Sequence, residues 1–165
     1  MRLYVMRHGP AEDRAPSGQD SDRKLTPSGR AIVDRVARAF HTGRGVGGAP
    51  PTPLRILTSP RARARETAAI MHAAMTSSPD AVEVHHELGG EVPIPLSLIA
   101  AAAASGVDTL LVGHQPVVEE LVQQLVGGRP VRTGFSTATI VGLDHAPDGA
   151  GWTLATHLDP SRLPG

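Results

Sequence analysis

The 165-residue sequence contains no cysteine, and this absence excludes disulfide bonds, thiolate nucleophiles and thiolate zinc sites. Aromatic residues are scarce, with one Trp, one Tyr and two Phe, so the core must be aliphatic and few side chains can stack on the bases of single-stranded nucleic acid. The 16 basic and 16 acidic residues balance, which leaves no net charge to attract a nucleic-acid backbone or an anionic membrane. We therefore expect no nucleic acid or membrane as a partner, and any bound anion must be held by local groups.

Long hydrophobic runs are also missing. No apolar stretch approaches the length of a membrane span, and the apolar segment at residues 3–6 ends at Arg7-His8, which is too early for a signal peptide. These absences predict a cytoplasmic protein. The chain length and the 40% apolar composition fit one compact domain over residues 1–165.

Short apolar runs alternate with segments of helical periodicity, a pattern typical of α/β proteins with a mostly parallel central sheet. Thr26-Pro27 and Ser59-Pro60 each combine a helix cap with a first-turn proline. The interval from Gly43 to Pro53 is rich in glycine and proline and is predicted to be a surface loop. The expected strands lie at residues 3–6, 55–58, 82–84, 109–112, 137–143 and 152–158, the last two being neighbours joined by a loop at Asp148-Gly149, and the expected helices lie at about 27–41, 60–75, 95–104 and 116–126.

Arginine and histidine residues follow three of the predicted strands. The first strand runs into Arg7-His8-Gly9, the second into residues 59–65, and the fourth into Gly113-His114-Gln115-Pro116. In open parallel sheets, ligands bind beyond the carboxyl ends of the strands. The sequence therefore predicts that these segments meet at one ligand-binding edge of the sheet.

Arg61, Arg63 and Arg65 lie at the start of the second predicted helix, where the partial positive charge of the helix N-terminus disfavours cations. A bound anion such as a phosphoryl group would remove this conflict, because backbone amides and an arginine side chain can hold it together. The residues alone do not select one of the three arginines. The alternative interpretation is that all three are solvated surface residues.

His8 directly follows a buried strand, so the sheet holds its backbone while its ring projects beyond the strand end. A neutral imidazole is a competent nucleophile toward phosphorus when one ring nitrogen is fixed as a donor. Gly9 permits a sharp turn and a close approach of the backbone to a ligand. His114 is positioned to donate to a phosphoryl oxygen. The alternatives are a core or capping histidine at His8 and a helix cap at His114.

Taken in order, five segments of the chain resemble the motifs of the histidine phosphatase (phosphoglycerate mutase-like) superfamily. The short chain and the Gly-His-Gln-Pro form are similar to the SixA-type phosphohistidine phosphatases within it. The resemblance implies a three-layer α/β/α sandwich, a covalent phosphohistidine intermediate, and no metal or other cofactor. The five segments are Arg7-His8-Gly9, Leu25-Thr26-Pro27-Ser28-Gly29, residues 59–68, Glu87-Leu88, and Val112-Gly113-His114-Gln115-Pro116.

The resemblance also implies roles for individual residues. His8 corresponds to the nucleophile, and Arg7, Arg63 and His114 correspond to side chains that bind the phosphoryl oxygens, with the backbone of Gly9 beside them. The Ser-Pro-x-x-Arg-Ala pattern is what selects Arg63 among the three arginines.

The general acid is less well defined by the resemblance. Glu87 falls where many family members place this acid, but Gly89-Gly90 follows it where SixA-like chains often have proline. The acid is therefore Glu87, Glu91 or neither, and a solvated loop charge is the alternative interpretation of Glu87.

The favoured expectation is a metal-independent phosphatase that removes the phosphoryl group from phosphohistidine on a protein. The alternatives are a phosphatase for a small phosphomonoester metabolite with the same site, and a non-catalytic module that binds phosphate or a phosphoprotein. A metal protein built on the histidines is disfavoured, because His85 and His86, adjacent on a short strand, would point to opposite faces. Asp13, Asp20 and Asp22 lie in a polar loop, for which a solvated loop is the favoured interpretation and a loop that lines the mouth of the site is the alternative.

Overall fold

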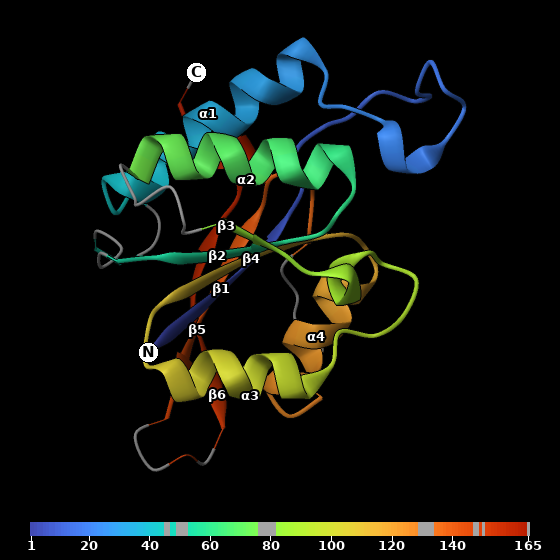
Figure 1. Ribbon diagram of the computed structural model, residues 1–165. Coiled ribbons are helices and arrows are strands. Elements are labelled where there is room, and N and C mark those ends of the chain that lie inside the picture. Colours follow the sequence, from blue (N-terminus) through green and yellow to red (C-terminus); the bar gives the residue numbers. More distant parts are fainter. Residues whose placement is uncertain are drawn as a thin grey trace.

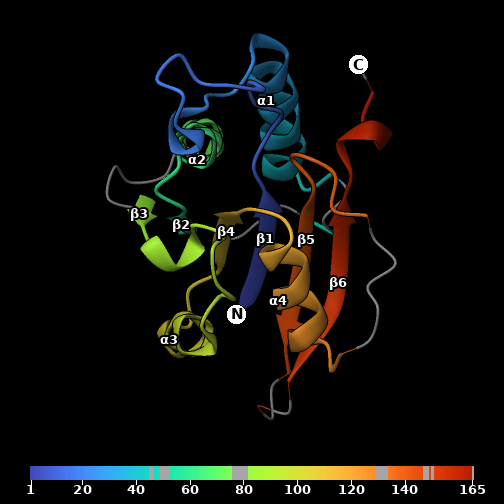
Figure 2. The ribbon, with the colours of Figure 1, turned by 90° about the vertical axis from the view of Figure 1, so that its right-hand side faces the viewer.

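A six-stranded sheet forms the middle layer, with helices α1 and α2 on one face and α3 and α4 on the other (Figures 1 and 2). The computed structural model describes residues 1–44, 47–48, 53–75, 82–128, 134–146, 149 and 151–164. The strands are β1 (Arg2–Arg7), β2 (Arg55–Thr58), β3 (Val82–Val84), β4 (Thr109–Gly113), β5 (Ile140–His145) and β6 (Trp152–Leu158), and the helices are α1 (Pro27–His41), α2 (Ala62–Met75), α3 (Leu96–Ser105) and α4 (Val117–Leu125).

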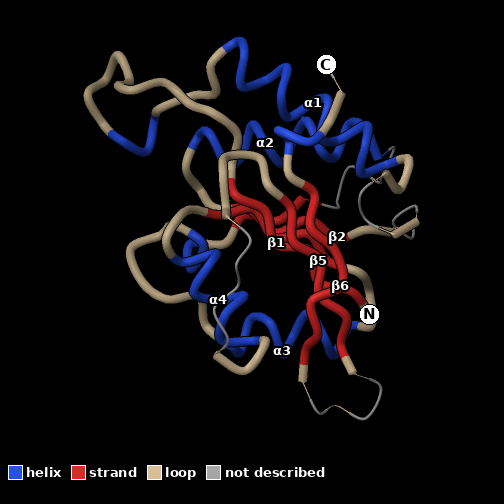
Figure 3. Tube along the Cα trace, turned by 180° about the vertical axis from the view of Figure 1, so that it is seen from behind, coloured by secondary structure: helices blue, strands red, loops and turns tan. Residues whose placement is uncertain are grey.

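The strand order is β3-β2-β4-β1-β5-β6, and the tube view in Figure 3 shows the sheet between the two helical layers. The strands β3, β2, β4 and β1 run parallel to one another. At one side of the sheet, β5 pairs antiparallel with β1, and β6 pairs antiparallel with β5. The predicted α/β class with a mostly parallel sheet and three layers is confirmed. No helix in the described ranges has the length and apolar character needed to cross a membrane.

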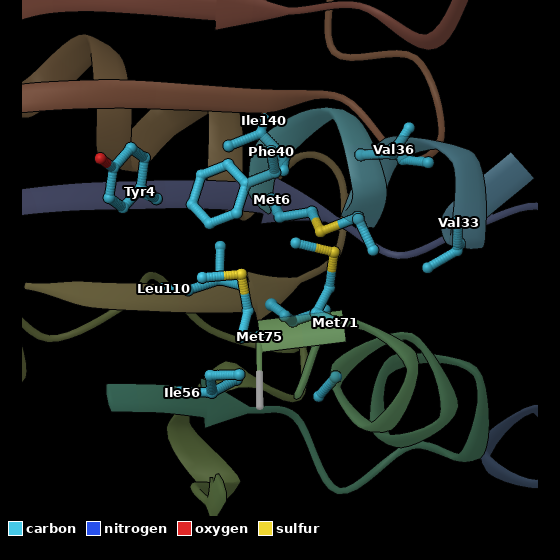
Figure 4. Close-up of a cluster of buried hydrophobic side chains, with 14 of the residues drawn as sticks. Tyr4, Met6, Val33, Val36, Phe40, Ile56, Met71, Met75, Leu110 and Ile140 are labelled. Carbon is cyan, nitrogen blue, oxygen red and sulfur yellow. The ribbon is translucent and has the colours of Figure 1, made fainter. Parts of the chain in front are cut away.

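Alternation of side chains along the strands creates two apolar layers. On β1, Tyr4 and Met6 point toward α1 and α2, whereas Leu3 and Val5 point toward α3 and α4. Figure 4 shows the first of these layers, which is mainly aliphatic and sulfur-containing, with an edge-to-face contact between the Tyr4 and Phe40 rings at 4.8 Å. This packing fixes both helical layers on the sheet and so fixes the positions of the strand ends.

Several predicted boundaries differ from the structure. The helix expected from Pro60 begins at Ala62, and the strand expected from Thr137 begins at Ile140. The second difference arises because Ala138 has a φ of 65° and donates its amide to the carbonyl groups at the end of β1, so the chain turns there instead of extending. Part of the predicted loop from Gly43 to Pro53, at residues 45–46 and 49–52, and Asp148 of the predicted β5–β6 loop lie outside the described residues.

The prediction for His85 and His86 is also wrong. β3 ends at Val84, and His86 instead begins the short 3-10 helix η3 (His86–Leu88). The amide of His85 donates to the carbonyl of Thr58 at 2.8 Å, which holds this segment beside the end of β2. The two rings therefore do not project from opposite faces of one strand.

Candidate active site

Strand register brings the ends of β1, β2 and β4 together. Arg7 pairs with Gly113 in the parallel β1–β4 ladder, so the residues that follow, His8 and His114, leave the sheet side by side. The ring centroids of the two histidines lie 4.9 Å apart, with the ring planes tilted by 52°. Ser59 follows β2 at the same edge, and its amide donates to the carbonyl of Val112. The predicted convergence of three strand ends is thus observed.

The tautomer of His8 is set by its neighbour. Nδ1 lies 2.7 Å from the carbonyl oxygen of Gly9, which only accepts, so Nδ1 carries the proton and Nε2 keeps its lone pair. Burial lowers the pKa of His8 from its ordinary value of 6.5 to about 4, and the charges of Arg63 and Arg7 act in the same direction. His8 is therefore a neutral imidazole at pH 7 with a basic nitrogen available at Nε2.

Arg63 is the arginine that reaches the histidine pair. It is only 4% exposed, and its Nε donates to Nε2 of His8 at 3.3 Å. Arg61 instead ion-pairs with Asp20 and with Glu91, while Arg65 is exposed and lines a separate groove beside β3. The structure therefore distinguishes the three arginines that the sequence alone left equivalent.

His114 is buried and hydrogen-bonded to Ser59. Its Nε2 lies 2.8 Å from Ser59 Oγ, and its Nδ1 is buried without a hydrogen-bond partner among the described residues. Burial, together with the nearby His8 and Arg63, lowers the pKa of His114 to about 3, so this imidazole is also neutral. Gly90 packs against the ring with a φ of +93°, and a Cβ at this position would lie 3.1 Å from Cβ of His114. The second glycine of Gly89-Gly90 thus allows the loop to lie close to the histidine.

Arg7 and Gly9 complete this edge in different ways. Nη1 of Arg7 donates to the carbonyl of Phe135 at 2.8 Å, while its Nε is buried and has no hydrogen-bond partner within the described ranges. The amide of Gly9 donates to Thr67 Oγ1 at 3.0 Å, and a Cβ at Gly9 would lie 2.4 Å from Cγ2 of Val33. Because its amide is engaged, the geometry does not support Gly9 as a phosphate ligand. The glycine is needed for packing against α1 and for orienting His8.

The carboxylates of the two candidate acids, Glu87 and Glu91, contact residues other than His8 and His114. Glu87 is half exposed on η3, and its carboxylate is 3.8 Å from Nδ1 of His85. Glu91 is exposed and forms an ion pair with Arg61, which lowers the pKa of the glutamate. The structure does not bring either carboxylate into contact with His8 or His114 among the hydrogen bonds of the described residues.

Asp20 lies beside the site, which matches the alternative interpretation of its loop rather than the favoured one. Its side chain is half exposed, its carboxylate and carbonyl oxygens contact Arg63, and the carboxylate also contacts Arg61 and Arg23. These arginine contacts lower the pKa of Asp20 to about 2, so it is ionised at pH 7. Nothing in its local sequence separates it from Asp13 and Asp22, because two of its partners lie about 40 positions away along the chain.

The site combines two neutral imidazoles with the buried guanidinium group of Arg63 and the half-buried one of Arg7, an arrangement suited to binding and attacking a tetrahedral anion. Over the part of the chain that is described, no three His, Asp or Glu side chains come together as metal ligands. The fold and this arrangement define an α/β protein with a cluster of histidine and arginine side chains at the carboxyl ends of parallel strands.

Comparison with known proteins identifies the family to which this α/β protein belongs. The model of the histidine phosphatase superfamily (branch 1) matches residues 3–89, more than half of the chain, and the chain belongs to this superfamily. An uncharacterized protein of Picosynechococcus sp. is 35% identical over 146 residues, covering 87% of this chain and 84% of the relative.

Solved structures extend the similarity over nearly the whole chain. The protein histidine phosphatase SixA complexed with tungstate is 28% identical, with a TM-score of 0.75 and 98% of both chains covered. The putative phosphohistidine phosphatase SixA from Agrobacterium tumefaciens is 27% identical, with a TM-score of 0.76, covering 96% of this chain and 97% of that one. A mycobacterial glucosyl-3-phosphoglycerate phosphatase, at 18% identity and a TM-score of 0.71, shares the fold. These comparisons confirm the family resemblance and support phosphatase activity.

Proposed function

We propose that this protein is a metal-independent phosphatase that removes the phosphoryl group from phosphohistidine on a protein, through a phosphorylated His8. The observation that carries the proposal is the contact of His8 Nδ1 with the carbonyl of Gly9, which fixes the neutral tautomer with its proton on Nδ1. Nε2 then keeps its lone pair and lies beside Arg63. A neutral, oriented imidazole next to a guanidinium group is the arrangement that nucleophilic attack on a phosphoryl group requires.

In the first step, Nε2 of His8 forms a bond to phosphorus as the bond from phosphorus to the substrate imidazole nitrogen breaks. The departing nitrogen keeps the electron pair and takes a proton from solvent. Arg7, Arg63 and His114 stabilise the negative charge on the phosphoryl oxygens during this in-line transfer.

In the second step, a water molecule attacks phosphorus, the bond to His8 Nε2 breaks, and orthophosphate leaves. The water loses a proton to solvent, and the electron pair of the broken bond returns to Nε2. The hydrogen bond from Nδ1 to Gly9 keeps the ring in the same orientation through both steps.

Two observations support phosphohistidine as the substrate. Two solved structures at 27–28% identity carry the SixA name, and both cover almost all of this chain. In addition, the phosphorus–nitrogen bond is labile and needs little help from an acid, which suits a site where the contact of the Glu87 carboxylate is with His85. Glu87 remains the candidate acid for phosphoesters, whose leaving groups need protonation.

The test compares initial rates on a phosphohistidine protein, a panel of sugar and glycerate phosphates, and an aryl phosphate. The proposal predicts the highest kcat/KM for the phosphohistidine protein and no loss of activity in chelator. Preference for a metabolite would favour the small-molecule alternative, and binding of phosphate without turnover would favour the non-catalytic module.

A second experiment identifies the nucleophile. Brief reaction with labelled substrate and a denaturing quench should leave acid-labile, alkali-stable label on His8, and His8→Ala should abolish both label and turnover while the circular dichroism spectrum stays unchanged. Substantial turnover by His8→Ala would refute the covalent route.

A further inference from the structure

The carboxylate of Asp20 accepts hydrogen bonds from three arginine side chains, of which Arg63 contacts His8. Its Oδ2 accepts from Nη1 of Arg61 at 2.6 Å and from Nη2 of Arg63 at 3.0 Å, while its Oδ1 accepts from Nη1 of Arg23 at 2.8 Å. The carbonyl oxygen of Asp20 accepts from Nη1 of Arg63 at 2.8 Å. One internal anion therefore uses both Nη donors of Arg63, the arginine that the proposed function assigns to the phosphoryl group.

Asp20 lies at the tip of a loop that is anchored separately at its base. The base is closed by a bridge between Ala11 and Leu25 and by the hydrogen bond from the amide of Glu12 to the carbonyl of Lys24 at 2.9 Å. At the tip, Asp22 accepts hydrogen bonds from serines of the same loop. Figures 1 and 2 show this tip, with the short 3-10 helix η1 (Asp20–Asp22), beside the N-terminal end of α2. Displacing the Asp20 side chain therefore leaves the base of the loop intact.

The contact extends to the nucleophile. Arg63, held from outside by Asp20, donates its Nε–H to the Nε2 lone pair of His8. This is the lone pair that has to attack phosphorus, so Arg63 must turn from His8 to the phosphoryl oxygens before reaction. The exposures fit such an arrangement, because Arg63 is 4% exposed while the Asp20 side chain is 52% exposed and free to move into solvent.

We propose that Asp20 is an internal competitor of the substrate for Arg63, so that a phosphoryl group binds by displacing an internal carboxylate. The proposal rests on the function proposed above, in which Arg63 binds the phosphoryl oxygens. A phosphoryl group on a monoester carries close to two negative charges near neutral pH, whereas Asp20 carries one. A dianion is therefore a stronger partner for the guanidinium group than the carboxylate that it displaces.

The rival interpretation gives the opposite sign. If Asp20 only braces Arg63 in the orientation needed for binding, its removal disorders the guanidinium group and weakens the binding of every anion. If Asp20 competes, its removal strengthens the binding of every anion by a similar factor, because each anion must displace the same carboxylate. Asp20→Asn is the suitable variant, because it removes the charge and keeps the shape of a half-exposed side chain.

The experiment measures inhibition of aryl phosphate hydrolysis by orthophosphate and by dimethyl phosphate, a monoanion, near neutral pH. Asp22→Asn is the matched control, since Asp22 lies on the same 3-10 helix and accepts from Ser17 and Ser21 rather than from arginine. For Asp20→Asn, we expect the inhibition constant of orthophosphate to fall about 3- to 10-fold, the effect of one charge-assisted hydrogen bond discounted for solvent exposure. The constant of dimethyl phosphate should fall by a similar factor, and Asp22→Asn should match the wild type.

Each outcome has one meaning. An inhibition constant for orthophosphate that rises or stays unchanged in Asp20→Asn, with an active wild type, overturns the role of Asp20 and leaves the proposed function standing. A lower constant for only one of the two anions overturns direct competition, which applies the same factor to both. A wild-type protein that neither hydrolyses phosphoryl substrates nor is protected against thermal unfolding by orthophosphate overturns the proposed function and, with it, this inference.

Discussion

Thr67 joins the end of β1 to the first turns of α2, and its replacement provides a stringent test of the site geometry. Its buried hydroxyl accepts from the amide of Gly9 at 3.0 Å and donates to the carbonyl of Arg63 at 2.7 Å. Thr67→Val keeps the shape of the side chain but removes both hydrogen bonds. The amide of Gly9 is then buried without an acceptor, and the carbonyl of the same glycine is the group that orients His8.

An unsatisfied buried amide costs about 1–3 kcal/mol. We therefore expect Thr67→Val to lower the free energy of unfolding by about 2 kcal/mol, which corresponds to a fall in Tm of about 4–8 °C for a domain of this size. Urea titration followed by circular dichroism measures the first quantity and calorimetry the second. We also expect a fall in kcat, because Gly9, whose carbonyl holds Nδ1 of His8, loses the anchor of its amide.

Thr67→Ser is the matched control for this prediction. It keeps the hydroxyl and removes one buried methyl group, at a cost of about 1 kcal/mol. Thr67→Val should therefore be less stable than Thr67→Ser and slower in turnover. If the valine variant equals the serine variant in kcat and exceeds it in stability, the hydroxyl does not support Gly9 or Arg63, and the explanation for the threonine at this position is refuted.

Two further predictions follow from the burial of charge and of imidazole. Burial lowers the pKa of His8 to about 4 and that of His114 to about 3, so between pH 6.5 and about 4 the unfolded chain binds protons that the folded chain does not. Stability should thus be fully present above pH 6.5 and fall as the pH drops toward 4, and a urea midpoint that does not change over this interval would contradict the lowered pKa values. Arg63→Ala should weaken orthovanadate binding by about 1.5–3 kcal/mol, the range for hydrogen bonds to a charged group, and an unchanged affinity by calorimetry would transfer the role to Arg61.

The order and type of the elements could be predicted because local signals and tertiary packing agree. Thr26-Pro27 predicts the start of α1, and in the structure the Thr26 side chain accepts from the amide of Gly29 while Pro27 is the first helical residue. The sequence pattern predicts the start of β5 at Thr137, three residues before its observed start at Ile140, because the pattern begins before the strand does. The turn at Ala138, whose amide is shared by the carbonyls of Arg7 and His8, is a tertiary contact that a local pattern does not carry.

The candidate site could be predicted in part for the same reason. His8 and His114 follow parallel strands, so the topology alone brings them to one edge. Helical spacing also favours Arg63 among the three arginines. Residues 63, 67, 71 and 75 recur at four-residue spacing, so they share one face of α2, and all four are buried. The tautomer of His8 and the contacts of Asp20 depend on side-chain geometry across the fold, and residue type and spacing do not specify either.

The burial of Arg63 explains why a carboxylate lies beside the proposed phosphoryl site. A guanidinium group as buried as that of Arg63 is costly without an anion, because burial disfavours the charged form, and desolvation indeed lowers its pKa while Asp20 raises it. Asp20 supplies that anion. Because the aspartate is the exposed partner and the arginine the buried one, the proposed displacement moves Asp20 into water and leaves the arginine buried. On the proposed function, the same ion pair that stabilises Arg63 limits the affinity for phosphate, which favours release of orthophosphate after the second step.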